Sequence, residues 1–102
     1  LRKYLDDGQD AQGKGNYKIA LACYKKVMDC KFEKFAKIAK DFNDDFIKQC
    51  VKMVERGVKQ YNSSEKDSKQ HKEVKPLLQK IAKEMKGTEA GDAAEKALKE
   101  LK

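Results

Sequence analysis

The side chains that could do chemistry in this chain are few and widely spaced. Cysteines stand at positions 23, 30 and 50, the only histidine is His71, and Asp44 and Asp45 form an acidic pair. A single histidine in a polar stretch does not pair with a serine or cysteine nucleophile, and no Cys-x-x-Cys motif indicates a zinc or redox site. The first turn of a helix favours negative charge, which explains the acidic pair. The sequence therefore predicts no catalytic, cofactor-binding or metal-binding residues.

The cysteine spacing bears on a disulfide. Cys23 and Cys30 lie on one expected helix, about 10.5 Å apart along its axis, and disulfide Cα atoms must approach to roughly 4.4–6.8 Å. Cys23 lies seven residues after Asn16 and Cys50 lies seven after Asn43, and both asparagines are expected to cap helices. If those helices are parallel, the two cysteines lie at one height, so we predict a Cys23–Cys50 disulfide. Cys30 is then buried, free or joined to a second chain. The alternative is three reduced cysteines that pack as small apolar residues.

Two further features agree with secretion. Asn62 begins an Asn-Ser-Ser triplet in an expected surface loop, and such triplets accept N-linked glycans in secreted proteins. The sequence starts at Leu1 instead of methionine, and it has no apolar run of the roughly 18 residues that span a membrane. We therefore expect a secreted protein without a membrane span, with the cytoplasm as the alternative.

The elements that position these residues are expected to be helices throughout. Apolar residues recur at helical spacing, the chain has one proline, and no alternating strand pattern competes. Helices are expected over 1–12, from 17 through 30, over 31–41, over 44–61, from Pro76 in a first turn to Gly87, and after the cap Thr88, with a polar loop over 62–75. One long kinked helix over 31–61 is the alternative to the break before 44. The 102 residues are expected to form a single domain, a compact all-α bundle of five to six short helices that begins with an antiparallel hairpin.

A pattern of small and aromatic residues predicts how the first two helices pack. It consists of Gly8, Gly15, Tyr17, Ala20 and Tyr24. In this pattern residues 8–28 resemble a tetratricopeptide repeat, with a glycine in the first helix, a turn at Gly15 and Tyr17, and small and aromatic positions in the second helix. The resemblance implies two helices in close approach, with the tyrosines filling the adjacent gap. No second copy follows at the family's spacing of about 34 residues, so it implies one hairpin and no repeat array.

The charge indicates the kind of partner. The formal net charge is +7 and comes almost wholly from lysine, since Arg2 and Arg56 are the only arginines. Lysine gives diffuse attraction to anionic surfaces, whereas bidentate recognition prefers arginine, so sequence-specific binding to nucleic acid is not expected. An ordinary solvated exterior is the alternative to a binding surface. The predicted basic surface comprises Lys31, Lys34, Lys37, Lys40, Lys48, Lys52 and Lys59.

Three classes of function fit these features. The first is a non-enzymatic, secreted helical effector or inhibitor that binds an anionic surface of another protein, with polyanions as a second class of ligand. A lysine-rich chain without tryptophan and with few cysteines is similar to the small helical salivary proteins of blood-feeding insects. That resemblance implies targets in host defence, such as complement or contact-pathway assemblies. The alternatives are an intracellular adaptor built on the repeat-like hairpin and a carrier whose Phe32, Phe35, Phe42 and Phe46 line a cavity for a small apolar ligand.

Overall fold

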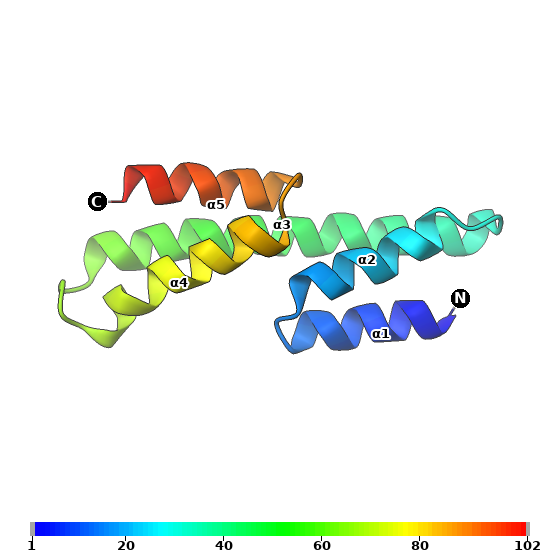
Figure 1. The fold of residues 1–102 in the computed structure, drawn as a ribbon, viewed down its shortest axis with the longest axis horizontal. Helices are drawn as coiled ribbons and strands as arrows, with labels where there is room; N and C mark the ends of the chain where they lie inside the picture. Colours follow the sequence, from blue (N-terminus) through cyan, green and yellow to red (C-terminus); the bar gives the residue numbers. More distant parts are fainter. Residues whose placement is uncertain (1, 102) are drawn as a thin grey trace. The chain divides into compact units, whose positions relative to one another are not determined.

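The computed structural model describes residues 2–101, in which all regular elements are α-helices. They are α1 (Arg2–Gly13), α2 (Tyr17–Met28), α3 (Glu33–Ser63), α4 (Lys69–Glu84) and α5 (Glu89–Glu100) (Figure 1). The all-α class is confirmed, and five helices lie within the expected range. One of them is not short, because α3 has 31 residues. The chain divides into two compact units, unit 1 (residues 1–46) and unit 2 (residues 47–102), and each has its own core.

Unit 1 is packed around Tyr24 of α2, whose side chain is fully buried. The rings of Phe42 and Phe46 lie edge-on to it, each with its centroid 6.2 Å from that of Tyr24. Tyr17 adds a fourth ring, 5.8 Å from Phe46. The Tyr24 hydroxyl donates a hydrogen bond of 3.0 Å to Gln12 Oε1 of α1, so the buried phenol keeps a polar partner. The tyrosine stripe predicted for the second helix is therefore the centre of this core.

The packing of α1 against α2 depends on a glycine. Gly8 is buried against the Tyr24 ring, and a Cβ atom there would lie only 2.6 Å from Tyr24 Cε1. The turn between the helices contains Gly15 at φ +81°, a backbone conformation that residues with a Cβ atom rarely adopt. Asn16 occupies the expected cap position of α2, although its side chain makes no capping hydrogen bond. The close contact expected at Gly8 is present.

The break expected between residues 41 and 44 is wrong, because α3 continues through it. Asp44 and Asp45 lie inside the helix and are exposed, so they occupy its solvent side instead of a first turn. Asn43 is likewise an interior residue and caps nothing. An unbroken apolar stripe outweighs the local capping preference of these residues. The stripe that runs through this segment consists of Ala39, Phe42, Phe46, Cys50 and Val54.

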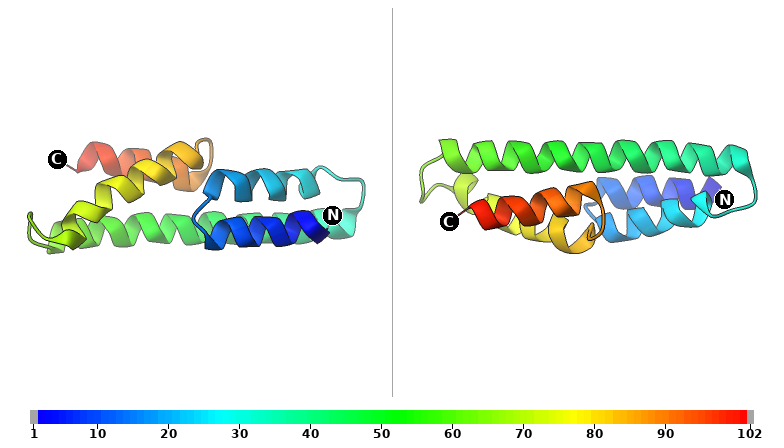
Figure 2. Two further views of the ribbon diagram at one scale, coloured as in Figure 1. Left: turned by 60° about the horizontal axis from the view of Figure 1, so that its bottom comes forward. Right: turned by 90° about the horizontal axis from the view of Figure 1, so that it is seen from above.

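Unit 2 has an aliphatic core made mostly by α4 and α5. α4 contributes Val74, Leu78 and Ile81, and Met85 follows directly after it; these four are at most 1% exposed. α5 contributes the small residues Ala90, Ala94 and Ala97. Figure 2 shows α4 and α5 side by side. Gly91 lies so close to the Met85 backbone that a Cβ atom there would overlap the Met85 carbonyl oxygen. The small residues of α5 therefore allow a close approach to the segment that ends α4.

Hydrogen bonds at the start of α5 match the expected cap. Thr88 Oγ1 accepts a hydrogen bond of 3.1 Å from the Gly91 N–H and donates one of 2.7 Å to the Met85 carbonyl. Gly87, at φ +89°, allows the chain to reverse after α4. The stop at Gly87 and the cap at Thr88 are both confirmed.

The connection from α3 to α4 is shorter than the expected loop over 62–75. α3 continues to Ser63 and α4 begins at Lys69, where Ser68 caps it by accepting a hydrogen bond of 3.2 Å from the His71 N–H. Pro76 lies inside α4 and not in its first turn. Residues 69–73 are polar but helical. The cap at Ser68 stabilises this first part of α4, and the buried Val74 anchors the turn that follows it.

Candidate binding surfaces

The lysines of the predicted basic surface all lie on the outside of the protein. Lys31 precedes α3, the other six are on α3, and all seven are exposed. Within the described residues, none of the seven ammonium groups forms an ion pair; the ion pairs found there include Lys14 with Asp10 and Lys69 with Glu73. Their charges are therefore available to a binding partner.

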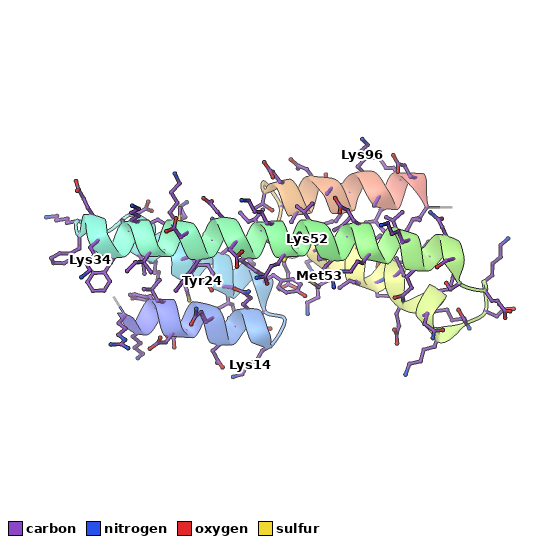
Figure 3. All side chains as sticks on the ribbon, turned by 180° about the vertical axis from the view of Figure 1, so that it is seen from behind. Lys14, Tyr24, Lys34, Lys52, Met53 and Lys96 are labelled. Carbon is purple, nitrogen blue, oxygen red and sulfur yellow. The ribbon has the colours of Figure 1, made fainter. Side chains whose placement is uncertain are left out.

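These lysines form one cluster in each unit. In unit 1, Lys34 and Lys37 are three residues apart on α3 and are neighbours on its surface, with Lys34 near the helix start in Figure 3. The exposed Asp41, Asp44 and Asp45 follow along the same helix. In unit 2, Lys48 and Lys52 are four residues apart, and Glu55 stands between them and Lys59. The basic residues are thus interrupted by acidic ones along α3.

Aromatic side chains accompany the lysines of unit 1. Phe32 is 63% exposed and packs edge-on against Phe35, with 6.5 Å between the ring centroids. Both are neighbours of Lys31 and Lys34 in the sequence. Phe42 and Phe46, in contrast, pack on Tyr24 in the core of unit 1. The four phenylalanines expected to line a ligand cavity are therefore divided: Phe42 and Phe46 build the core, and Phe32 and Phe35 pack against each other.

Unit 2 contains an open groove between α3 and α4, with a volume of about 510 Å³. Figure 3 marks Met53 on α3, at the side of the helix that borders α4. Sequence reasoning missed this groove, although Gly57 in an apolar stripe and Arg56 among lysines are visible signals. The lining residues are Met53, Arg56, Gly57 and Gln60 of α3, and Glu73, Val74 and Leu77 of α4.

All three cysteine thiols are free in the structure, with Cys23 and Cys30 half-buried and Cys50 buried. Burial raises the pKa of the Cys50 thiol from 9.0 to about 11, because the apolar surroundings disfavour the thiolate. The argument that paired Cys23 with Cys50 relied on Asn43 as a helix cap. Asn43 is not a cap, so that argument is wrong, and the disulfide itself stays a prediction.

His71 was expected to lie solvated in a loop, and it is instead half-buried at the start of α4. Its ring stacks on Tyr61 with 3.8 Å between centroids, and its Nδ1 lies 3.0 Å from the Tyr61 carbonyl oxygen. The ring therefore helps to hold the end of α3 against α4. Asn62, the predicted glycosylation residue, is exposed in the last turn of α3 and not in a loop.

Comparison with known proteins identifies no relative. The chain matches no family model, no curated protein and no solved structure. None of the helices within residues 2–101 combines the length and the apolar character needed to cross a lipid bilayer. The same residues contain no group of three or more His, Cys, Asp or Glu side chains placed to bind a metal ion. The features that indicate a function are therefore the two lysine clusters, the exposed Phe32 and the groove.

Proposed function

We propose that the protein is a non-enzymatic binding module that docks on an acidic surface of a partner protein through the exposed lysines of α3. The observation that supports this proposal is the set of seven exposed lysines, six on α3 and Lys31 just before it, without ion pairs in the described chain. An unpaired surface charge attracts a partner of opposite sign over about one Debye length, roughly 8 Å at physiological ionic strength. Such charges mainly raise the association rate. Polyanions would use the same lysines.

We further propose that the module is secreted and acts as an effector or inhibitor. The resemblance to salivary proteins points to host-defence assemblies such as complement or the contact pathway as targets. Exposure of Asn62 is compatible with attachment of a glycan. The second candidate, an intracellular adaptor built on α1 and α2, is supported by the free thiols and by the close contact of Gly8 with Tyr24.

A mass measurement separates these two candidates. The natural protein would be alkylated before and after reduction, and the added mass would be counted per thiol. Two thiols that react only after reduction support secretion and the disulfide, and peptide mapping then shows whether Cys23 and Cys50 form it. Three thiols that react without reduction support the intracellular adaptor and contradict the disulfide.

The binding proposal is tested with two variants that have the same net charge but carry their charge changes at different places. In one variant Lys34, Lys37, Lys48 and Lys52 become glutamate, which takes the formal net charge from +7 to −1. The matched control carries the same four changes at Lys3, Lys66, Lys86 and Lys96, which are also exposed. Each protein is passed over immobilised poly-glutamate, a substitute for an acidic protein surface, and over heparin.

We expect the parent protein to be retained at low salt and released as salt rises. The α3 variant should elute with little retention, while the control with equal net charge should stay close to the parent, because local charge density decides contact. Equal loss in both variants would mean that only net charge matters and would contradict a specific basic surface. Retention on duplex DNA should not depend on its sequence.

A further inference from the structure

We propose that the groove between α3 and α4 of unit 2 (the α3–α4 groove) binds an amphipathic helix of the partner protein. The helix would place an apolar side chain on the groove floor and a carboxylate on Arg56. This inference rests on the proposed binding function and names the partner segment. It assigns anchoring to the groove, whereas the lysines of α3 supply attraction at a distance.

The groove is lined by a glycine, Gly57, that close packing of the two helices does not require. A Cβ atom at Gly57 would lie 3.6 Å from Val74 Cγ1 and 3.8 Å from Leu78 Cδ2, which are ordinary van der Waals distances. Gly8 and Gly91, in contrast, have no room for a Cβ atom. Glycine in a helix interior is less stable than alanine, because it loses more backbone entropy on folding. Alanine would therefore fit at position 57, yet the residue that lines the groove there is glycine.

Apolar side chains surround that space. Met53 on α3 and Leu77 on α4 are half-buried, and both line the groove beside the buried Val74. The flexible thioether of methionine adapts to different apolar partners, which is why methionine is frequent on peptide-binding surfaces. The floor therefore suits an aliphatic side chain such as leucine.

The rim of the groove carries charge that selects the partner. Arg56, on the α3 side, is exposed and forms no ion pair within residues 2–101. Arginine binds a carboxylate through two parallel hydrogen bonds, which lysine does not match. Glu73, on the α4 side, forms an ion pair with Lys69 at 4.0 Å. A partner helix with an acidic residue toward α3 and a basic residue toward α4 complements both rims.

An open groove favours a protein segment over a small molecule. Small-molecule sites enclose about 70–90% of the ligand surface, whereas this groove is bordered by two helices and is open to solvent. An amphipathic helix needs only one apolar face buried, and binding of such helices in grooves between helices is a recurrent mode of recognition. Unit 2 has fourteen Lys and Arg against nine Asp and Glu, so an acidic helix is favoured over a basic one.

The first test uses a synthetic helical peptide as the probe. The fluorescein-labelled peptide carries two leucines four residues apart, a glutamate on one flank and a lysine on the other. Its affinity is measured by fluorescence anisotropy with the parent protein, with Arg56→Gln and with Arg2→Gln, which removes the other arginine, outside the groove. We expect Arg56→Gln to weaken binding by about tenfold, the effect of losing one charged hydrogen-bonding partner. Arg2→Gln should change it less than about twofold.

The second test fills the groove. Gly57→Leu places a side chain on the floor, while Gly57→Ala adds a single methyl group for which there is room. We expect Gly57→Leu to weaken peptide binding at least tenfold and Gly57→Ala to change it little. Circular dichroism confirms that each variant is folded. The Arg56 comparison decides the question if Gly57→Leu does not fold.

The outcomes separate this inference from the proposed function. Absence of peptide binding at millimolar protein, or equal binding by Arg56→Gln and Arg2→Gln, would overturn the groove assignment and leave the basic surface standing. If the groove variants release the peptide faster while the four-lysine variant associates at the parent rate, the groove stands and the role of the lysines is wrong. Slower association in the four-lysine variant and faster dissociation in the groove variants would support both.

Discussion

Units 1 and 2 achieve close helix packing with different side chains. In unit 1 the contact between α1 and α2 is filled by the Tyr24 ring, which lies against Gly8 and between Phe42 and Phe46. In unit 2 the contact between α4 and α5 is made by small residues, and Gly91 meets the backbone of Met85. A tyrosine ring can shift by rotation about its side-chain bonds, whereas a backbone carbonyl cannot. Glycine is therefore harder to replace with a larger residue at position 91 than at position 8.

The two units also differ in their surfaces. Unit 1 has ten Lys and Arg against eight Asp and Glu, and it exposes Phe32. Unit 2 has a larger positive excess and carries the α3–α4 groove. The aromatic residues of unit 1 mostly build its core, and the aliphatic core of unit 2 leaves an apolar opening beside it. Binding is therefore expected to depend more on unit 2, and stability more on the aromatic centre of unit 1.

The largest effect is expected from Tyr24→Ala, which removes the centre of the aromatic core. Losing a buried aromatic side chain of this size costs about 3–5 kcal/mol. Urea unfolding followed by circular dichroism measures the loss, and Phe32→Ala, at an exposed phenylalanine, is the control that should change the free energy of unfolding by less than about 0.5 kcal/mol. Similar losses in both variants would contradict the core described for unit 1.

The same variant tests whether residues 1–102 unfold as the predicted single domain. Amide hydrogen exchange of α4 and α5 reports on unit 2 alone. If the chain is one cooperative domain, Tyr24→Ala should speed exchange in α4 and α5 as much as in α2. Unchanged protection of α4 and α5 would mean that the two units unfold separately.

A smaller loss is expected from alanine at the two tight glycines. Overpacking a core typically costs about 1–3 kcal/mol. The cost of Gly91→Ala should lie at or above the upper end of this range, because the Met85 carbonyl would have to move and the hydrogen bond from Gly91 N–H to Thr88 would be distorted. Gly8→Ala should cost less, because the Tyr24 ring can turn. Urea midpoints in the reverse order would show that the Tyr24 ring is held more rigidly than the backbone near Met85.

Gly57→Ala should stabilise the protein by about 0.5–1 kcal/mol, because alanine lowers the entropy cost of the helix and its methyl group fits. A rise of the thermal midpoint by a few degrees is expected. Gly13→Ala at the end of α1, where nothing lies within 4 Å, is a control for the effect of the substitution without a tertiary contact. A fall in stability for Gly57→Ala would mean that α3 and α4 pack more closely than described.

The smallest effect concerns alkaline pH. The pKa of Cys50 is raised by burial to about 11 in the folded protein, so folding favours the neutral thiol. Its contribution to stability is complete below pH 9.0 and is lost as pH rises toward and through about 11. Burial, and secondarily the charge of Cys23, also raises the pKa of Tyr24. Stability of the parent measured from pH 8 to 9.5 should therefore fall more steeply than that of Cys50→Ala. Parallel curves would contradict the burial of this thiol.

Local signals were sufficient to predict most of the helices. Helical spacing of apolar residues, Gly87 as a stop and Thr88 as a cap depend on neighbours within one or two turns, and the structure agrees with each. The resemblance of residues 8–28 to a repeat predicted the contact of Gly8 with the aromatic side of α2. The exposed lysines could also be predicted, since a charged residue opposite an apolar stripe faces water.

The sequence by itself therefore determined the helical class, the stripe that each helix buries and the positive exterior, because these follow from backbone hydrogen bonding and from the cost of burying charge. Tertiary structure decided the features in which two local preferences compete or distant residues meet. It kept α3 continuous through Asn43 and Asp44, since the buried side chains on both sides of that segment hold one helix. It also placed His71 on Tyr61 and formed the groove that Gly57 and Leu77 line, because both depend on how closely α4 packs against α3.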